Sequence, residues 1–171
     1  MIVIVTGLPG SGKSYFASRL AKMIDAAYIN SDRVRKYTFT HSVYTEEEKL
    51  AVYEEMLAEM KDAVHRHKQV VLDATFYKKD IREKFFDKAG ATGALFLIEV
   101  RADEALIKER LKQTRTDSEA DFGVYTMIKE KWEPLGESHL ILESTDDSIN
   151  SMLRQALDYL NTKTNDFRAD R

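Results

Sequence analysis

The stretch GLPGSGKS, residues Gly7 to Ser14, decides the fold. It matches the pattern G-x-x-x-x-G-K-[ST] at every fixed position, and it directly follows the apolar run Ile2 to Val5, which predicts a buried strand. Apolar residues at helical spacing come after it: Phe16, Leu20, Met23 and Ile24. A glycine-rich loop between a strand and a helix indicates a phosphate-binding loop, because backbone N–H groups and the helix N-terminus face the polyphosphate there.

The residue types in this loop suit a nucleoside triphosphate with Mg²⁺. Glycines permit backbone conformations and close approaches that a Cβ would block. Lys13 is placed to reach the β and γ oxygens, and the hydroxyl of Ser14 is a ligand for Mg²⁺. The predicted nucleotide-binding residues are Gly7, Pro9, Gly10, Ser11, Gly12, Lys13, Ser14 and Tyr15. The loop alone does not distinguish a kinase from another NTPase.

Further apolar runs alternate with amphipathic segments along the chain. Strands are expected at residues 27–29, 70–74, 94–100 and 140–142. A long helix is expected from Thr45, where Thr45 and Glu48 form a capping box. Its predicted apolar stripe consists of Leu50, Tyr53, Leu57, Met60 and Val64. Continuous apolar strands between amphipathic helices predict an α/β fold with a central parallel sheet flanked by helices, the three-layer fold of P-loop NTPases.

Length and composition limit the possible organisation and partners. The 171 residues predict one domain over residues 1–160, with a lid at about 110–125 and a loose polar tail at 161–171. A net charge of −3 excludes a wholly basic nucleic-acid coat but permits a local basic groove. The chain has no cysteine, which excludes disulfides and thiolate chemistry and makes a reducing cytoplasm the default expectation. No membrane span and no obligate protein partner are expected.

Asp32 and Arg35 follow the second predicted strand. In open parallel sheets ligands bind beyond the carboxyl ends of the strands, so Asp32 is a candidate base for an acceptor hydroxyl. Arg35 lies one helical turn onward and suits an acceptor phosphate. The structural alternative is that Asp32 caps a helix and pairs with Arg35.

Asp73 ends the apolar run at residues 70–72, where a carboxylate orients Mg²⁺ or its waters. Thr75 follows and is expected to line the same cleft. The alternative for Asp73 is a cap for the next helix.

Arg110 and Arg115 flank a polar stretch that suits a closing lid. A lid of this kind brings guanidinium groups onto the transferring phosphate. The alternative is a solvated helical face. Residues 144–147, after the last predicted strand, are expected near the nucleotide base.

Taken together, these residues resemble P-loop kinases related to the polynucleotide 5′-hydroxyl kinase domain and the zeta toxins, and AAA-type ATP-binding kinase-like proteins. The resemblance spans roughly residues 2–160. Its motifs are GLPGSGKS at Gly7 to Ser14, INSD at Ile29 to Asp32 followed by Arg35, and VLDAT at Val71 to Thr75. It implies ATP as the donor, Asp32 as general base, contact of Arg35 with a nucleic-acid phosphate, and a lid arginine, Arg110 or Arg115, at the γ-phosphate.

Three functions remain open from the sequence. The first is a kinase for the 5′-hydroxyl of RNA or DNA, and the second is a kinase for a small-molecule hydroxyl, such as that of a nucleoside, sugar or antibiotic. The third is a switch that hydrolyses ATP and transfers nothing. Four aromatic residues either stack a base, line a small pocket or belong to the core: Tyr37, Phe39, Tyr44 and Phe76.

Overall fold

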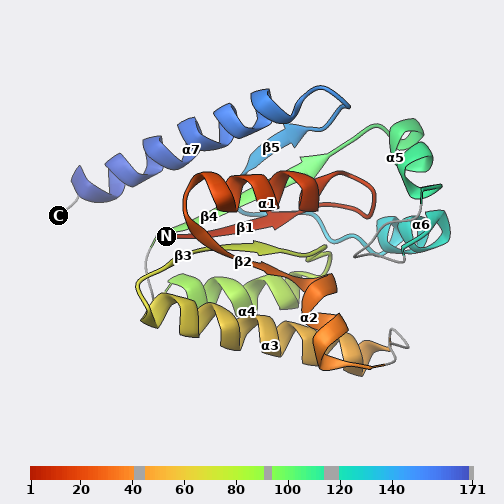
Figure 1. The fold of residues 1–171 in the computed structure, drawn as a ribbon, viewed down its shortest axis with the longest axis horizontal. Helices are drawn as coiled ribbons and strands as arrows, with labels where there is room; N and C mark the ends of the chain where they lie inside the picture. The colour runs from red at the N-terminus through yellow and green to blue at the C-terminus, as the bar shows by residue number, and fades with distance from the viewer. Residues whose placement is uncertain (41–44, 91–93, 114–119, 170–171) are drawn as a thin grey trace.

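A computed structural model describes residues 1–40, 45–90, 94–113 and 120–169 of the chain, with side chains through residue 162. This part of the chain forms five strands and seven helices, with one or two helices after each strand (Figure 1). In order they are β1 (Ile2–Thr6), α1 (Lys13–Met23), β2 (Ala26–Asn30), α2 (Ser31–Thr38), α3 (Glu46–His65), β3 (Gln69–Asp73), α4 (Lys79–Gly90), β4 (Leu95–Arg101), α5 (Glu104–Leu111), α6 (Phe122–Glu130), β5 (Leu140–Glu143) and α7 (Ile149–Ala169).

The sheet is wholly parallel and has the order β2-β3-β1-β4-β5. The predicted α/β fold with a central parallel sheet is therefore confirmed. The strand β1 lies in the middle, so the glycine loop that follows it leaves the centre of the carboxyl edge. Asp73 of β3 is in register with Val5 of β1 on one side and with Asn30 of β2 on the other. The carboxyl ends of these three strands therefore meet at one edge of the sheet, where β1 leads into the glycine loop and β2 and β3 end in polar residues.

Helices cover both faces of the sheet (Figure 1). On one face α1 and α7 pack on a core that includes Val3, Phe16 and Leu153. On the other face α3 and α4 pack on a core that includes Ile4, Met56 and Phe85. Side chains of a strand point alternately to the two faces, so even positions of β1 serve one core and odd positions the other. The two layers of helices leave the carboxyl edge to loops and to α2, α5 and α6.

Two sequence predictions about helices were wrong in detail. The apolar stripe of α3 includes Val52 and Met56, both buried, whereas Leu50 is 45% exposed. The segment 161–171, predicted as a loose tail, continues α7 as far as Ala169. It contains neither glycine nor proline to stop the helix. None of the described helices is long and apolar enough to cross a lipid bilayer.

Arg82 of α4 ties two loops together beneath the sheet edge. Its side chain is buried, and its guanidinium donates to the carbonyl of Phe76 at 3.0 Å and to the carbonyl of Pro134 at 2.9 Å. Phe76 has a φ of 46°, a left-handed conformation that is costly for an aromatic residue. The arginine therefore holds a strained turn that directly follows the Asp73 strand end.

Replacing Arg82 by methionine should lower the free energy of unfolding by roughly 2–4 kcal/mol, because the buried carbonyl of Phe76 and the part-buried carbonyl of Pro134 lose their donor. Chemical denaturation measures this. Lys84→Met on the same helix, where the side chain is half exposed, is the matched control and should change stability by less than about 0.5 kcal/mol. Equal effects of the two variants would contradict the bridging role of Arg82.

Candidate functional site

The loop at residues 7–14 has the backbone of a tight anion-binding turn. Gly7, Gly10 and Gly12 have φ angles of 153°, 82° and 91°, which residues with a Cβ rarely adopt. Gly12 directly precedes α1, so the first N–H groups of this helix face the space in front of the loop. Lys13 and Ser14 form the first positions of α1 and are half-buried. The predicted arrangement of strand, loop and helix is present.

A cavity of about 360 Å³ lies beside this loop. Its walls come from the loop and α1, from the end of α5, and from the segment between β5 and α7. They include Gly10, Gly12, Lys13, Ser14, Tyr15, Arg110, Gln113, Ser144, Thr145, Asp146 and Ser148. The volume suits a small organic ligand. The segment that the sequence analysis expected near a base, residues 144–147, thus contributes three of these wall residues.

Arg110 joins the loop to the opposite wall of this cavity. Its guanidinium donates to Ser144 Oγ at 3.1 Å and to the carbonyl of Ser11 at 3.4 Å, and it lies 3.3 Å from an Asp146 carboxylate oxygen. The position is fixed by α5, whose Ile107 and Leu111 pack with Tyr125 in a small separate core. A cation is therefore held at the loop. Contact of Arg110 with a bound phosphate stays a prediction. Arg115 lies outside the described residues.

Asp73 is a buried carboxylate with an uneven set of partners. Its Oδ2 accepts from the Tyr28 hydroxyl and from Asn30 Nδ2, both at 2.6 Å. Its Oδ1 is equally buried and has no hydrogen-bond partner among the described residues. Because Asp73 lies in register with Val5, whose core contacts are with α1, the carboxylate lies on the face of the sheet covered by α1.

The pKa of Tyr28 is raised well above its ordinary value, first by burial and then by the negative charge of Asp73. The phenol therefore stays protonated near neutral pH and remains a donor to Asp73. A Mg²⁺ ion fits this set of residues, since Asp73 Oδ1 lacks a partner and Ser14 at the start of α1 supplies a hydroxyl. Among the described residues no cluster of three or more histidines and carboxylates offers another metal site, and His65 and His67 form none.

Asp32 lies in the first turn of α2 and does not cap it. The cap is Asn30, whose side-chain oxygen accepts from the N–H of Arg33 at 3.0 Å. The capping alternative for Asp32 is therefore wrong. Arg35 lies 3.1 Å from a carboxylate oxygen of Glu48 on α3, and both side chains are nearly buried. A carboxylate thus already balances the charge of Arg35, which the sequence analysis assigned to an acceptor phosphate.

The other residues predicted for the acceptor side lie in different environments. Thr75 is half-buried just after β3, and its carbonyl accepts from the Thr6 hydroxyl at 2.6 Å. Phe76 is fully buried, with its ring 5.0 Å from that of Phe85, so it belongs to the core and lines no pocket. Tyr37 is 60% exposed, and Tyr44 lies outside the described residues.

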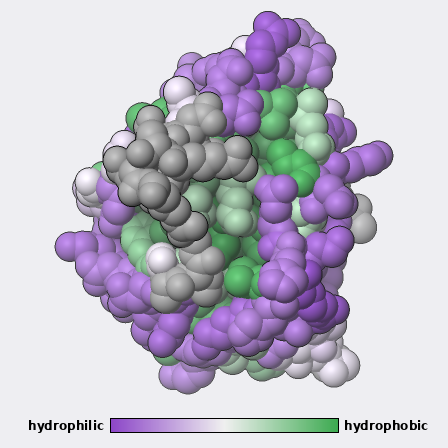
Figure 2. Space-filling view, turned by 90° about the vertical axis from the view of Figure 1, so that its left-hand side faces the viewer, coloured by the Kyte–Doolittle hydropathy of each residue, from purple (hydrophilic) through white to green (hydrophobic). Residues whose placement is uncertain are grey.

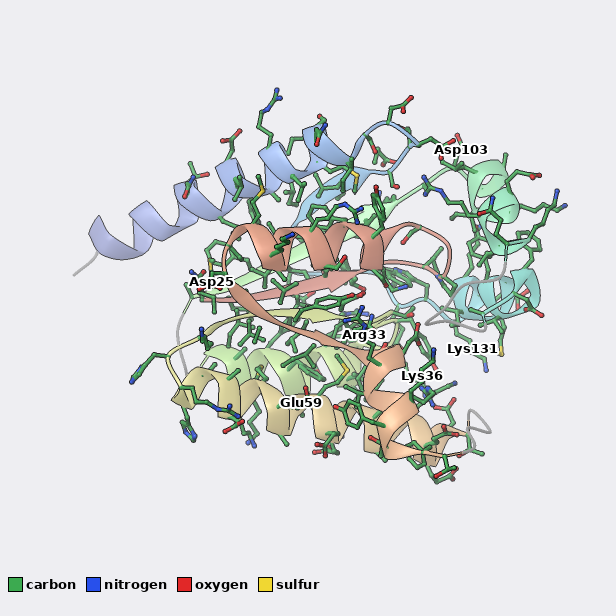
Figure 3. The ribbon with its side chains drawn as sticks, viewed as in Figure 1. Asp25, Arg33, Lys36, Glu59, Asp103 and Lys131 are labelled. Atoms are coloured by element: carbon green, nitrogen blue, oxygen red, sulfur yellow. The ribbon has the colours of Figure 1, made fainter. Side chains whose placement is uncertain are left out.

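The labelled charged residues of Figure 3 lie at both edges of the sheet. In Figure 3, Arg33 and Lys36 on α2 and Asp103 before α5 lie toward the carboxyl edge, and Asp25 lies at the amino edge. The face at the amino edge has hydrophobic residues in its middle and hydrophilic residues around its rim (Figure 2). The groups capable of phosphate and proton chemistry are gathered at the carboxyl edge.

A family model described as "AAA domain" matches residues 2–135. The chain belongs to this AAA domain family. The structure of this chain is similar to the crystal structure of a gluconokinase from Sinorhizobium meliloti 1021. The TM-score is 0.71 at 20% sequence identity, and the match covers 98% of this chain and 95% of that chain. The Mycobacterium tuberculosis APS kinase CysC, solved with AMPPNP and APS, gives a TM-score of 0.70 at 16% identity over 94% and 96% of the two chains.

Chaetomium thermophilum Kti12, solved in complex with ADP-AlF3, has a TM-score of 0.65 at 20% identity and covers 92% of this chain and 98% of its own. At these identities the similarity concerns the fold. This AAA-domain protein therefore has the α/β fold of P-loop NTPases, in agreement with the loop at residues 7–14. The finer resemblance to polynucleotide kinases and zeta toxins is not among these findings.

Sequence analysis missed four residues that the structure brings to the site: Tyr28, Asn30, Glu48 and, as partner of Arg110, Asp146. Asn30 was quoted only as part of a motif. Its position directly before the helix that carries Asp32 was a signal for an N-cap. Glu48 was assigned to a capping box, but its side chain faces Arg35. Only the packing of α3 against α2 brings these two residues together.

Gly12→Ala should abolish nucleotide binding and lower the free energy of unfolding by at least about 1–2 kcal/mol, the cost of a left-handed residue with a Cβ. An added Cβ would lie 2.7 Å from Ser144 Oγ, in addition to the backbone strain. Gly136→Ala is the matched control, because nothing lies within 4 Å of its added Cβ. Chemical denaturation and titration with ATP measure both effects. Unchanged binding in Gly12→Ala would contradict the role of the loop.

Proposed function

We propose that this protein is an ATP-dependent kinase that transfers the γ-phosphate to a hydroxyl group of a small molecule. The observation that carries the proposal is the cavity of about 360 Å³ at the glycine loop, into which Lys13, Ser14 and Arg110 converge. A fold of this kind supports many functions, and these residues are what favour phosphoryl transfer. Phosphoryl transfer requires mainly positioning and neutralisation of charge, which these groups supply.

The donor side is formed by residues of the loop and of α5. The backbone N–H groups of the loop, with the exception of Pro9, and those of the α1 N-terminus would cradle the phosphates, and Lys13 would neutralise the β and γ oxygens. Arg110, which already bridges Ser11 and Ser144, adds a second cation at the loop. A bound Mg²⁺ would offset part of the negative charge of the phosphates. Ser14 and Asp73 are the residues that would hold it, directly or through water.

The acceptor side is formed by the start of α2. Asp32 lies one residue into this helix, immediately beyond the carboxyl end of β2. A carboxylate at this position accepts the proton of an attacking hydroxyl. Thr75, half-buried after the neighbouring strand β3, is the proposed second contact to the acceptor. Arg35 belongs to this side of the site as well, with Glu48 fixing its guanidinium.

Two observations favour a small acceptor over a polynucleotide. The similar structures whose names state an activity include a gluconokinase and an APS kinase, both of which act on small molecules. In addition, Arg35 faces a nearly buried Glu48, so it is not a lone cation reserved for a nucleic-acid phosphate. The polynucleotide 5′-hydroxyl, the first acceptor predicted from the sequence, is therefore the second candidate and is included in the test.

The test offers γ-labelled ATP and Mg²⁺ together with sugars, sugar acids, nucleosides, aminoglycosides and 5′-hydroxyl oligonucleotides. We expect label on a small molecule, and a loss of at least about 100-fold in rate for Asp32→Asn, since general base catalysis contributes this much. Asp87→Asn, an exposed carboxylate on α4, is the control and should retain full activity.

Label on an oligonucleotide alone would replace the small acceptor by a polynucleotide. Release of free phosphate alone, at the same rate in Asp32→Asn, would contradict the kinase and favour a hydrolytic switch.

A further inference from the structure

The side chain of Asn30 makes two contacts that belong to different parts of the site. Its oxygen accepts from the N–H of Arg33 and so caps α2, the helix that carries Asp32. Its nitrogen donates to Asp73 Oδ2 at 2.6 Å. Asn30 is only 5% exposed, so neither contact competes with bulk water. One planar amide therefore connects the start of the acceptor helix to the buried carboxylate of β3.

The partners of Asp73 determine which of its oxygens is available. Both donors, Tyr28 and Asn30, bind Oδ2, and Oδ1 is left buried without a partner in the described part of the chain. A carboxylate without such donors is free to rotate and to exchange its two oxygens. The two hydrogen bonds prevent this, so that one oxygen is presented in a fixed direction. Partners of this type in the outer shell of a metal site orient the ligand itself.

Among the common N-cap residues, asparagine alone can cap a helix with its side-chain oxygen and donate to a carboxylate with its side-chain nitrogen. Serine and threonine cap well, but their side chains are shorter and have no amide nitrogen. Aspartate has the same shape, but at neutral pH it has no donor and would place a second negative charge beside Asp73. The residue type at position 30 is thus explained by the two contacts together, and the cap alone would not require it.

We propose that Asn30 is a positioning residue that orients Asp73 for the Mg²⁺ of a bound nucleotide and fixes α2 in relation to it. The inference rests on the proposed function. It assigns Asn30 no contact with the substrate. Its effect passes through Asp73 on the metal side and through the α2 N-terminus on the acceptor side.

The experiment is calorimetric titration with the non-hydrolysable β,γ-imido analogue of ATP, with and without Mg²⁺. The measured quantity is the dissociation constant without Mg²⁺ divided by the dissociation constant with Mg²⁺. This measurement requires no turnover. Asn30→Ser keeps the cap and removes the donor, whereas Asn30→Ala removes both. Thr45→Ala removes the cap of α3, a helix that packs on the face of the sheet opposite the Asp73 carboxylate, and serves as the control for loss of a cap.

We expect Asn30→Ser and Asn30→Ala to lower the ratio by about tenfold or more, as is usual for outer-shell partners of metal ligands. Tyr28→Phe, which removes the second donor to the same oxygen, should lower it too. Affinity without Mg²⁺ should stay within about twofold, and Thr45→Ala should leave the ratio unchanged. Among the Asn30 and Tyr28 variants, only Asn30→Ala should lower the melting temperature through loss of the α2 cap, and Thr45→Ala should lower it through loss of the α3 cap.

Two results distinguish a failure of the role inferred for Asn30 from a failure of the proposed function. If the unmodified protein gains affinity with Mg²⁺ and Asn30→Ser gains as much, the role of Asn30 is wrong and the proposed function stands. If the unmodified protein binds no nucleotide, the proposed function itself is wrong. A loss of affinity in Asn30→Ser that is equal with and without Mg²⁺ would also overturn the inference, since it would indicate a purely structural role.

Discussion

The close approach of the glycine loop to its three neighbours is the constraint on which the site depends. A Cβ at Gly7 would lie 2.4 Å from the Val100 carbonyl of β4, and one at Gly10 would lie 2.9 Å from Ile107 of α5. At Gly12 it would meet Ser144, after β5, at 2.7 Å. Backbone alone fits in these places. Glycines therefore allow β4, α5 and the segment after β5 to close around one loop, and these elements bring Arg110 and the cavity walls with them.

The second half of the site follows from the order of the sheet. Since β3 lies between β2 and β1, Asp73 is next to both the strand that leads into the loop and the strand that leads into α2. The face covered by α1 receives Tyr28, Asn30 and Asp73, a buried polar group in a face that is otherwise apolar. A buried polar network of this kind is stable only when its donors and acceptors are matched. The unmatched Oδ1 of Asp73 is the exception, and it is the atom that the proposed Mg²⁺ or its waters would contact.

The sequence predicted the fold well, because the signals for it are local. A run of apolar residues predicts a strand, a fixed pattern predicts the loop, and Thr45 with its N–H partner Glu48 marks a helix start that the structure confirms. The contact of Arg110 with Ser11 of the loop joins residues 99 positions apart in the chain. The contact of Arg35 with Glu48 joins two successive helices and depends on how they pack. No spacing in the sequence reveals them. The predicted apolar stripe of α3 was wrong at Leu50 for a related reason. Leu50 and Val52 fit a helical period equally well, and only the packing against neighbouring elements determines which of them is buried.

Binding of a nucleoside triphosphate is the claim from which the rest follows, and Lys13 tests it most directly. Titration with the β,γ-imido analogue of ATP in the presence of Mg²⁺ should show binding to the unmodified protein. Lys13→Ala should weaken this binding by roughly tenfold to 100-fold, the value of a hydrogen bond to a charged group. An absence of binding to the unmodified protein, or equal affinity in Lys13→Ala, would contradict the account.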